Sequence, residues 1–231
     1  MSSWKIWEAL PFYNKRPKTV IHFLHISKTG GTAIKHALKG ARSSRYEIVL
    51  HDHQFRIDDV PEGELTVFFL REPIDRFVSG FNSRLRQGRP RYHSKWTPDE
   101  TLAFGRFATP NALAEALRST SEAERLAAEH AMNAISHVRD KMSHWIGKDL
   151  APNDPRIFFT GFQESLNEDF AALTTRLCLH TAPVLPDNEV DAHRNPAEMP
   201  RSLSPMAIEI LKEWYADDIK LYSTLRHRAP R

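Results

Sequence analysis

Short runs of apolar, β-favouring residues alternate with polar segments in the first third of the chain. Residues 20–26 (VIHFLHI) form the first run, and the small residues 27–31 that follow allow a sharp turn. Two further runs cover residues 46–50 and 65–70, and the second is almost continuously apolar. A strand without polar alternation is typical of burial on both faces of a sheet. We therefore predict three strands in this part of the chain.

A helical period replaces this pattern after residue 72. Apolar residues recur at helical spacing up to residue 87, with Pro73 suited to the first turn and Gly88 to the stop. Apolar spacing and the positions of proline and glycine also divide the rest of the chain into helices, a strand and a loop. We predict helices at 32–38, 166–177 and 204–225, an alanine-rich helical stretch at 112–145 interrupted near 119–121, a strand at 156–160 and a long loop at 180–200.

The order of these elements predicts an α/β fold. Strand, turn, helix, strand, strand and helix follow one another, as in a domain whose central, mostly parallel sheet is flanked by helices. We expect a single P-loop-like domain over residues 1–231, with an N-terminal arm at 1–18 and a helical insertion at about 99–150. A chain of this length can bury a core of its own, and it is too short for two full-sized domains.

Composition excludes several classes of protein. Cys178 is the only cysteine, so neither an intramolecular disulfide nor a cysteine-rich zinc site can form, and a reducing compartment fits. The apolar runs fall far short of the roughly 18 to 20 residues that a membrane span needs, and we expect a soluble, cytoplasmic protein. The net charge of +3, with twelve histidines, suits an anionic ligand but is too small to indicate nucleic acid. The sequence predicts no particular oligomeric state.

The segment HISKTGGT, from His25 to Thr32, carries the strongest local signal. It lies between a predicted strand and a predicted helix, where small residues let backbone N–H groups converge on an anion and the helix N-terminus adds partial positive charge. Lys28 and the hydroxyl groups would complete such a cradle. The alternative is a glycine-rich turn with an exposed lysine, but the flanking strand and helix favour phosphate or sulfate binding.

This segment is not a Walker A loop. That motif places its lysine after the glycines, whereas Lys28 precedes Gly30 and Gly31. The strand at 65–70 ends in Arg71, where a Walker-type NTPase carries a magnesium-holding aspartate. An arginine at the carboxyl end of a central strand is suited to an anion and not to a metal. Ser79 follows eight residues later, in the predicted helix.

Together the two motifs, HISKTGGT and FFLREPIDRFVSGF, resemble the nucleotide-binding elements of the sulfotransferase superfamily that uses 3′-phosphoadenosine 5′-phosphosulfate, without a metal. The resemblance is greatest to the carbohydrate branch that includes heparan sulfate 2-O-sulfotransferase, and it covers roughly residues 20–81. It implies that the loop holds the 5′-phosphosulfate and that the later motif holds the 3′-phosphate. The residues concerned are Lys28, Thr29, Gly30, Gly31 and Thr32 for the first role and Arg71 and Ser79 for the second.

Two departures from the family pattern are visible. Ser27 stands where the family usually has proline, and Glu72 replaces the commoner aspartate. The chain is also shorter than the Golgi enzymes of this branch, so their location and glycan substrate do not follow from the resemblance.

Transfer to a hydroxyl also needs a group that removes the proton. His51 and His53 follow the predicted strand at 46–50, and alternate side chains of an extended segment share one face. Imidazole accepts a proton near neutral pH. The related enzymes carry a similar pair whose second histidine is the base. We predict His53 as base and His51 as an acceptor-binding or assisting residue, although twelve histidines make a chance pair easy to obtain.

A basic and aromatic stretch follows the predicted helix at 73–87. It is either a solvated helix end or a platform for the acceptor, in which aromatic faces stack on sugar rings and arginines such as Arg84 and Arg91 hold anionic groups. Residues 193–195 raise the same alternative, because family members close over the nucleotide there. We predict a hydroxyl-bearing acceptor, with a glycan favoured. A P-loop-like kinase or NTPase and a noncatalytic nucleotide- or glycan-binding module remain alternatives.

Overall fold

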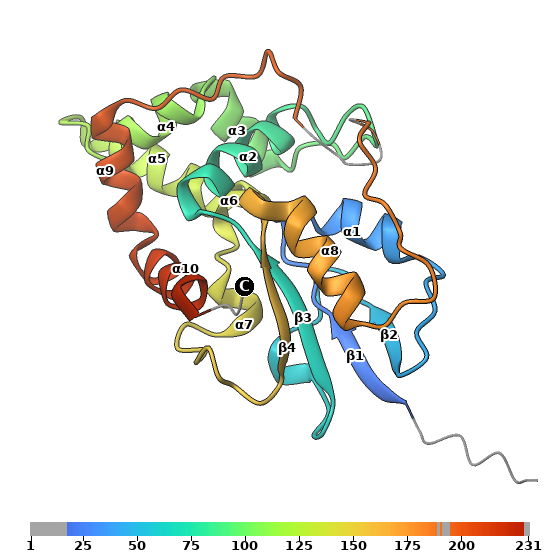
Figure 1. Cartoon of the computed structure of the whole chain (residues 1–231). Coiled ribbons are helices and arrows are strands. Elements are labelled where there is room, and N and C mark those ends of the chain that lie inside the picture. Colours follow the sequence, from blue (N-terminus) through green and yellow to red (C-terminus); the bar gives the residue numbers. More distant parts are fainter. Residues whose placement is uncertain (1–17, 189, 191–194, 229–231) are drawn as a thin grey trace, which may run out of the picture.

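The computed structural model describes residues 18–188, 190 and 195–228. Its centre is a four-stranded sheet in the order β2-β1-β3-β4, in which every neighbouring pair is parallel (Figure 1). The predicted α/β fold is confirmed. Nearly all of the expected arm at 1–18 lies outside the described residues. The strands are β1 (Thr19–Phe23), β2 (Tyr46–Leu50), β3 (Leu65–Leu70) and β4 (Ile157–Phe162).

Helices occupy most of the remaining described chain. The helix predicted from residue 73 begins at Pro73, where the Glu72 side chain accepts a hydrogen bond from the Asp75 backbone N–H and so caps the first turn. The helices are α1 (Gly31–Leu38), α2 (Pro73–Leu85), α3 (Pro98–Arg106), α4 (Pro110–Ala116), α5 (Glu122–Ala134), α6 (Ser136–Arg139), α7 (Ser143–Ile146), α8 (Leu166–Arg176), α9 (Pro205–Trp214) and α10 (Ala216–Arg228). Two 3-10 turns, η1 (Ile57–Asp59) and η2 (Gln163–Ser165), complete the set.

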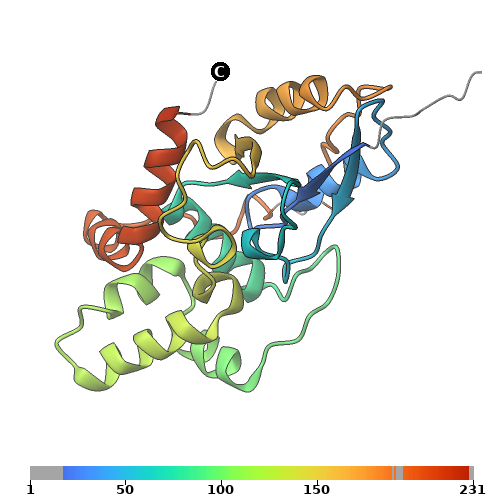
Figure 2. The same cartoon turned by 90° about the horizontal axis from the view of Figure 1, so that it is seen from below.

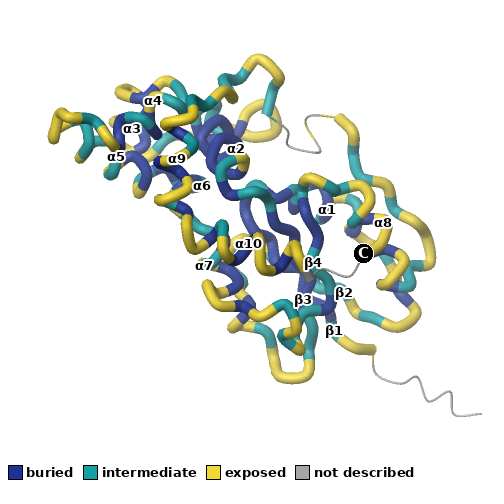
Figure 3. The backbone as a smooth tube through the Cα atoms, turned by 60° about the vertical axis from the view of Figure 1, so that its left-hand side comes forward, coloured by how far each residue is buried: buried dark blue, intermediate teal, exposed yellow. Residues whose placement is uncertain are grey.

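Both faces of the sheet are covered, as the apolar run at 65–70 predicts. Val67 and Phe69 pack with α1 and α8 on one face, while Phe68 and Leu70 pack with α7 and α10 on the other. Figure 2 shows the sheet between the orange helix α8 above it and the yellow helix α7 below. The dark blue tube in Figure 3 follows the strands and the middle of α2. Because the strands are parallel, their carboxyl ends lie together at one edge of the sheet, and packing on both faces holds them there.

A third apolar cluster lies beside the sheet and joins α2 to the helices α3–α6 and α9. Of these helices, α3–α6 lie within the stretch of about 99–150 that the sequence predicts as a helical insertion, whereas α2 and α9 come from outside it. Phe81, which is fully buried, packs edge-on against Phe104 of α3. Gly80 lets α6 approach α2 closely, because a Cβ atom there would lie 2.7 Å from the His137 carbonyl oxygen. This cluster therefore fixes α6 against α2, next to the carboxyl ends of the strands.

The terminal helix predicted over residues 204–225 is wrong in one respect: it is two helices that meet at Tyr215. Leu211 packs in the α2–α6 cluster, whereas Leu221 packs against the sheet. One straight helix cannot reach both surfaces, so the chain bends between them. The buried Tyr215 hydroxyl donates to the Val138 carbonyl oxygen at 2.9 Å and holds the bend in place.

No helix within the described part of the chain combines the length and apolar character that crossing a membrane requires.

Candidate functional site

The loop after β1 is shaped to present backbone N–H groups. Lys28 and Gly30 adopt left-handed conformations, with φ of 67° and 89°. Gly30 caps α1 without a side-chain hydrogen bond, so no side chain of the loop occupies the N–H groups of the first turn. A Cβ atom on Gly31 would lie 2.2 Å from Cδ2 of His25, so only glycine fits there. The two glycines thus build an open helix N-terminus.

Arg76, for which the sequence carries no local signal, anchors this loop through Ser27. Its fully buried side chain donates from Nε to the Ser27 carbonyl oxygen and from Nη2 to Ser27 Oγ, both at 2.9 Å. It also donates to the Asp140 carbonyl oxygen and lies over the ring of Trp145. Ser27, the departure from the family's usual proline, therefore gives Arg76 an extra acceptor, which adds to the order of the loop.

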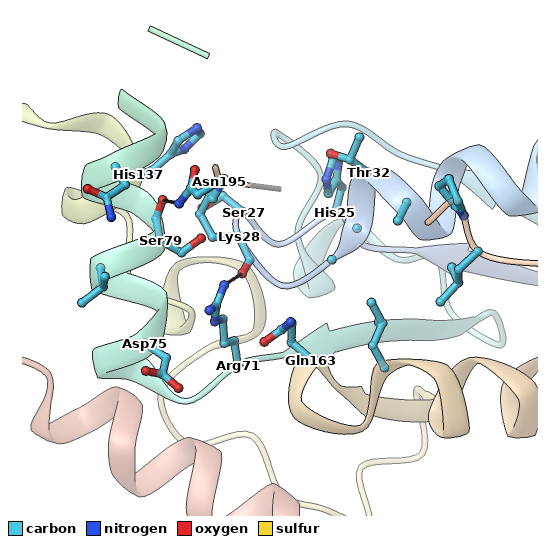
Figure 4. A pocket seen from close by; sticks show the side chains of 18 of the residues that line it. His25, Ser27, Lys28, Thr32, Arg71, Asp75, Ser79, His137, Gln163 and Asn195 are labelled. Carbon is cyan, nitrogen blue, oxygen red and sulfur yellow. Dashed lines mark hydrogen bonds between the residues drawn. The ribbon is translucent and has the colours of Figure 1, made fainter. Parts of the chain in front are cut away.

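Lys28 and Arg71 meet although they are 43 residues apart. Arg71 Nη1 lies 3.5 Å from the Lys28 carbonyl oxygen, while Arg71 Nε is buried and has no hydrogen-bond partner among the described residues. Ser79 lies on α2, and Figure 4 shows Ser79 and Arg71 both next to Lys28. An arginine with an unused buried donor at this edge is suited to an anionic ligand.

A cavity of about 420 Å³ connects these groups. Its walls include most of the residues that the sequence assigns to anion binding, and its volume lies in the range of small-ligand sites. The predicted residues that line it are Lys28, Gly30, Gly31, Thr32, His53, Arg71 and Ser79.

The cavity is strongly cationic, and this affects Lys28. Burial lowers the pKa of the Lys28 ammonium to about 7, with further lowering by Arg86, Arg71 and Arg76. Desolvation and like charges both disfavour the protonated amine. A bound anion would reverse this, because it offsets the surrounding positive charge. The free protein therefore holds a lysine whose charge depends on what occupies the cavity.

His53 is held with one ring nitrogen already assigned. Its Nδ1 lies 2.7 Å from the His25 carbonyl oxygen, and because a carbonyl only accepts, Nδ1 carries the hydrogen of the neutral ring. Trp145 Nε1 donates to the His53 carbonyl oxygen at 2.8 Å, and the His25 ring packs 3.9 Å away between centroids. Burial lowers the pKa of His53. The ring is thus neutral near pH 7 with its Nε2 lone pair available, which is the state that a general base needs.

A family model described as the sulfotransferase family matches residues 13–223. The chain belongs to the sulfotransferase family. No curated protein matches it.

His51 does not share the cavity with His53 in this sulfotransferase, so the expected common face is wrong. β2 ends at Leu50 and the chain bends at His53, so the alternation of an extended strand does not continue. His51 Nε2 instead lies 2.8 Å from His22 Nδ1, and His22 Nε2 pairs with Glu64 Oε2. The His51 ring also stacks on Phe55. His51 thus belongs to an internal chain of polar side chains, away from the acceptor role predicted for it.

Arg84 is likewise misassigned as an acceptor-binding residue. It is buried and forms a two-point ion pair with Glu100, through Nε at 2.7 Å and Nη2 at 2.6 Å. Nη1 donates to the Ser94 carbonyl oxygen, and Nη2 donates also to the Lys95 carbonyl oxygen. Its donors are engaged within the protein, so it joins α2 to α3. Arg91 is exposed and donates to the Val190 carbonyl oxygen, and its predicted acceptor role stays a prediction.

The Thr29 hydroxyl is also engaged, because it donates to the Ile26 carbonyl oxygen at 3.0 Å. Thr29 does not line the cavity, so its side chain shapes the loop, and its predicted role in anion binding stays a prediction for its backbone alone.

Three cavity residues of the sulfotransferase come from distant segments. Asn195 donates from Nδ2 to the Ser79 carbonyl oxygen at 3.0 Å and accepts from Arg86 Nε, and Arg201 donates to the Asn195 carbonyl oxygen at 2.9 Å. His137 of α6 also lines the cavity. Only Asn195 carried a sequence signal, through the loop at 193–195, whose residues 193 and 194 lie outside the described residues.

Among the residues that the structure describes, no group of three or more histidine, cysteine and carboxylate side chains is placed to hold a metal ion.

Proposed function

We propose that this sulfotransferase moves the sulfuryl group of 3′-phosphoadenosine 5′-phosphosulfate to a hydroxyl group of an acceptor. The observation that carries the proposal is that the Lys28 loop and the Arg71/Ser79 pair line one cavity. Two anion-binding elements that share a cavity match a nucleotide with phosphate groups at both its 5′ and 3′ positions.

The residues present fit this nucleotide. Arg71 has a buried Nε donor that no described residue accepts from, and α1 offers an N-terminus without a side-chain cap. We assign the 5′-phosphosulfate to Lys28 and the backbone of residues 29–32, and the 3′-phosphate to Arg71 and Ser79. When bound, the nucleotide supplies the sulfuryl group: the acceptor oxygen forms a bond to sulfur, and the bond from sulfur to the 5′-phosphate oxygen breaks with its electron pair going to that phosphate.

His53 would take the proton that the acceptor hydroxyl loses. Its Nδ1–H donates to the His25 carbonyl oxygen, so the proton would arrive at Nε2. The resulting imidazolium would keep the bond to His25 and donate from Nε2 to the acceptor oxygen. Lys28 would stabilise the charge that grows on the 5′-phosphate, because its ammonium is held beside that site by a rigid loop. Arg76 positions this loop and does not itself line the cavity.

The acceptor class rests on the resemblance of the two nucleotide-binding motifs to carbohydrate sulfotransferases. A sugar hydroxyl is therefore the acceptor that we propose, with glycans tested before peptide tyrosines and small alcohols. Tyr92, which is exposed and lines the cavity, and the exposed Arg91 that precedes it in the chain are the candidates for contact with such an acceptor.

Ligand-induced stabilisation tests the nucleotide assignment. Adenosine 3′,5′-bisphosphate at a hundred times its dissociation constant should stabilise the protein by about 2.7 kcal/mol, visible as a rise in melting temperature, whereas ATP with magnesium should not. Lys28→Ala and Arg71→Ala should each reduce the rise, and Lys39→Ala, which removes an exposed lysine at the end of α1, should not.

Transfer of labelled sulfuryl group from 3′-phosphoadenosine 5′-phosphosulfate to glycan acceptors then tests the reaction. A preference for ATP with magnesium would favour a kinase. Binding of the bisphosphate without transfer to any acceptor, together with a His53→Ala variant of unchanged function, would indicate a binding module.

A further inference from the structure

His137 enters the cavity from the helical segment between α2 and β4. It lies on α6, whose backbone contacts α2 at Gly80, the residue next to Ser79. Figure 4 shows His137 at the Ser79 end of the site, with His25 and Thr32 at the other end. Because Gly80 admits no Cβ atom, the position of His137 relative to the nucleotide-binding helix is fixed by backbone contact.

The His137 imidazole makes no hydrogen bond to any other residue of the described chain, although it lines the cavity. The neighbouring imidazoles differ in this respect, since His53 pairs with the His25 carbonyl oxygen and His51 pairs with His22. Burial lowers the pKa of His137 well below its usual value, and Lys28 and His53 lower it further. A neutral imidazole with one donor and one acceptor nitrogen therefore faces the cavity.

The separation of His137 and His53 suits one shared oxygen atom. Their ring centroids are 6.4 Å apart and the ring planes are inclined by 58°. An oxygen that hydrogen-bonds a nitrogen of each ring at about 2.8 Å lies about 4 Å from each centroid. Two such distances span 6.4 Å when they meet at roughly 105°, which is close to a tetrahedral angle. The rings are too far apart for a direct hydrogen bond along the line of centres, yet close enough to hold one hydroxyl between them.

We propose that His137 binds the acceptor hydroxyl that His53 deprotonates, so that the two imidazoles hold the same oxygen. This inference rests on the proposed function and adds the residue that orients the acceptor. The four directions of the oxygen are then all assigned. One is its bond to carbon, one is its hydrogen directed at His53 Nε2, one is a lone pair that accepts from the His137 N–H, and the last is the lone pair that attacks sulfur.

This assignment orients the reactive lone pair without a second base. The proton moves to His53, whereas His137 keeps its own proton and only donates a hydrogen bond. Replacing His137 by a side chain that cannot donate a hydrogen bond should therefore weaken acceptor binding, while a side-chain amide, which can donate, should restore it. Nucleotide binding should be unaffected, since the assigned phosphate contacts come from Lys28, Arg71 and Ser79.

Imidazole ¹⁵N NMR with glycerol as the hydroxyl probe tests the shared oxygen directly. In the wild-type protein saturated with adenosine 3′,5′-bisphosphate, resonances of His53 and His137 should shift together with one half-saturating glycerol concentration. His137→Ala should raise the concentration that half-saturates the His53 shift about tenfold, the effect of losing one hydrogen bond. His137→Asn should restore most of it. His130→Ala, which removes an exposed histidine on α5, should leave it unchanged.

Hydrolysis of 3′-phosphoadenosine 5′-phosphosulfate, with water as acceptor, gives the second measurement. The rate should fall in His137→Ala, recover in His137→Asn and stay unchanged in His130→Ala, with equal bisphosphate affinity in all variants. Glycerol shifts that appear at His53 alone, or at neither ring, would overturn the inference, as would a His137→Ala variant with wild-type shifts. Failure of the wild-type protein to bind the bisphosphate would instead refute the proposed function, and the glycerol titration without nucleotide would still decide the His137 assignment.

Discussion

His51 and His53 are two residues apart in the chain, yet they belong to different groups of side chains. His53 faces the cavity with its Nε2 lone pair available, whereas His51 is paired with His22 in a chain that ends at Glu64. Two arginines of the same region differ in the same way. Arg71 Nε lies buried beside the cavity with no partner among the described residues, whereas all three nitrogens of Arg84 donate to Glu100 or to backbone carbonyl oxygens. We expect side chains with an unpaired donor or acceptor to bind ligand, and side chains whose donors and acceptors are paired within the protein to stabilise the fold.

Substituting the two histidines should give the largest contrast. His53→Ala should lower kcat by about 10²- to 10⁴-fold, the usual contribution of a general base, while adenosine 3′,5′-bisphosphate affinity is retained. His51→Ala should keep most of the turnover, because the His51 side chain does not line the cavity. Steady-state sulfuryl transfer and bisphosphate binding measure the two effects. Equal losses in both variants would contradict the division into two groups.

The contrast between these histidines also shows what the sequence could and could not predict. The Lys28 loop was predictable because its conformation is local: two glycines between a strand and a helix determine where the N–H groups point. The assignment of His51 failed because it assumed that the strand continues, whereas β2 ends at Leu50. Sequence pattern carries the periodicity of a strand but not the residue at which tertiary packing ends it.

The remaining site residues depend on contacts between distant segments. Arg76 reaches Ser27, 49 residues earlier, and Asn195 reaches Ser79, 116 residues earlier. His137 reaches the cavity because α6 packs on Gly80. None of these contacts has a local motif, since each follows from how the helices pack. The fold class, by contrast, follows from the order of short strands and helices alone, and it is confirmed.

Substituting Arg71 and Arg84 should give the next largest contrast, since the first should change nucleotide affinity and the second the free energy of unfolding. Arg71→Ala should weaken adenosine 3′,5′-bisphosphate binding by about 30-fold or more, as expected when one member of a buried charge pair is lost. Arg84→Ala should leave that affinity unchanged in the folded protein but reduce the free energy of unfolding by about 3 to 5 kcal/mol, because Glu100 is left buried without its partner. Calorimetric titration and denaturant unfolding separate the two effects. Loss of nucleotide affinity in folded Arg84→Ala would argue against this contrast.

Lys28 should make nucleotide binding depend on pH. Its pKa is lowered to about 7 in the free protein by burial and by the neighbouring arginines, so the amine is mostly neutral above pH 7. A bound anion favours the protonated form and raises this pKa, so binding takes up a proton and affinity falls above pH 7, by up to about tenfold per pH unit. Below pH 7 the lysine is already charged, so its contribution to the pH dependence should disappear.

Calorimetry at pH 8 in two buffers of different ionisation enthalpy counts the protons taken up on binding adenosine 3′,5′-bisphosphate. Wild-type protein should take up nearly one, and Lys28→Met none. Lys39→Met removes an exposed lysine from the end of α1 and should behave as wild type. Uptake that persists in Lys28→Met would assign the proton to another group.

The chain from Glu64 to His51 should produce the smallest effect, and only on stability. Glu64→Gln keeps an oxygen that can accept from His22 Nε2 but removes the charge, which should cost about 1 kcal/mol of unfolding free energy, the difference between a charged and a neutral hydrogen bond. That corresponds to a decrease of about 2 to 4 °C in melting temperature for a chain of this size. Glu47→Gln, on the exposed side of β2, is the matched control and should not change it. Turnover of folded Glu64→Gln should equal that of wild type, because neither Glu64 nor His22 lines the cavity. A loss of turnover at unchanged stability would mean that the two histidine groups are coupled, and the separation inferred from their hydrogen bonds would then be incorrect.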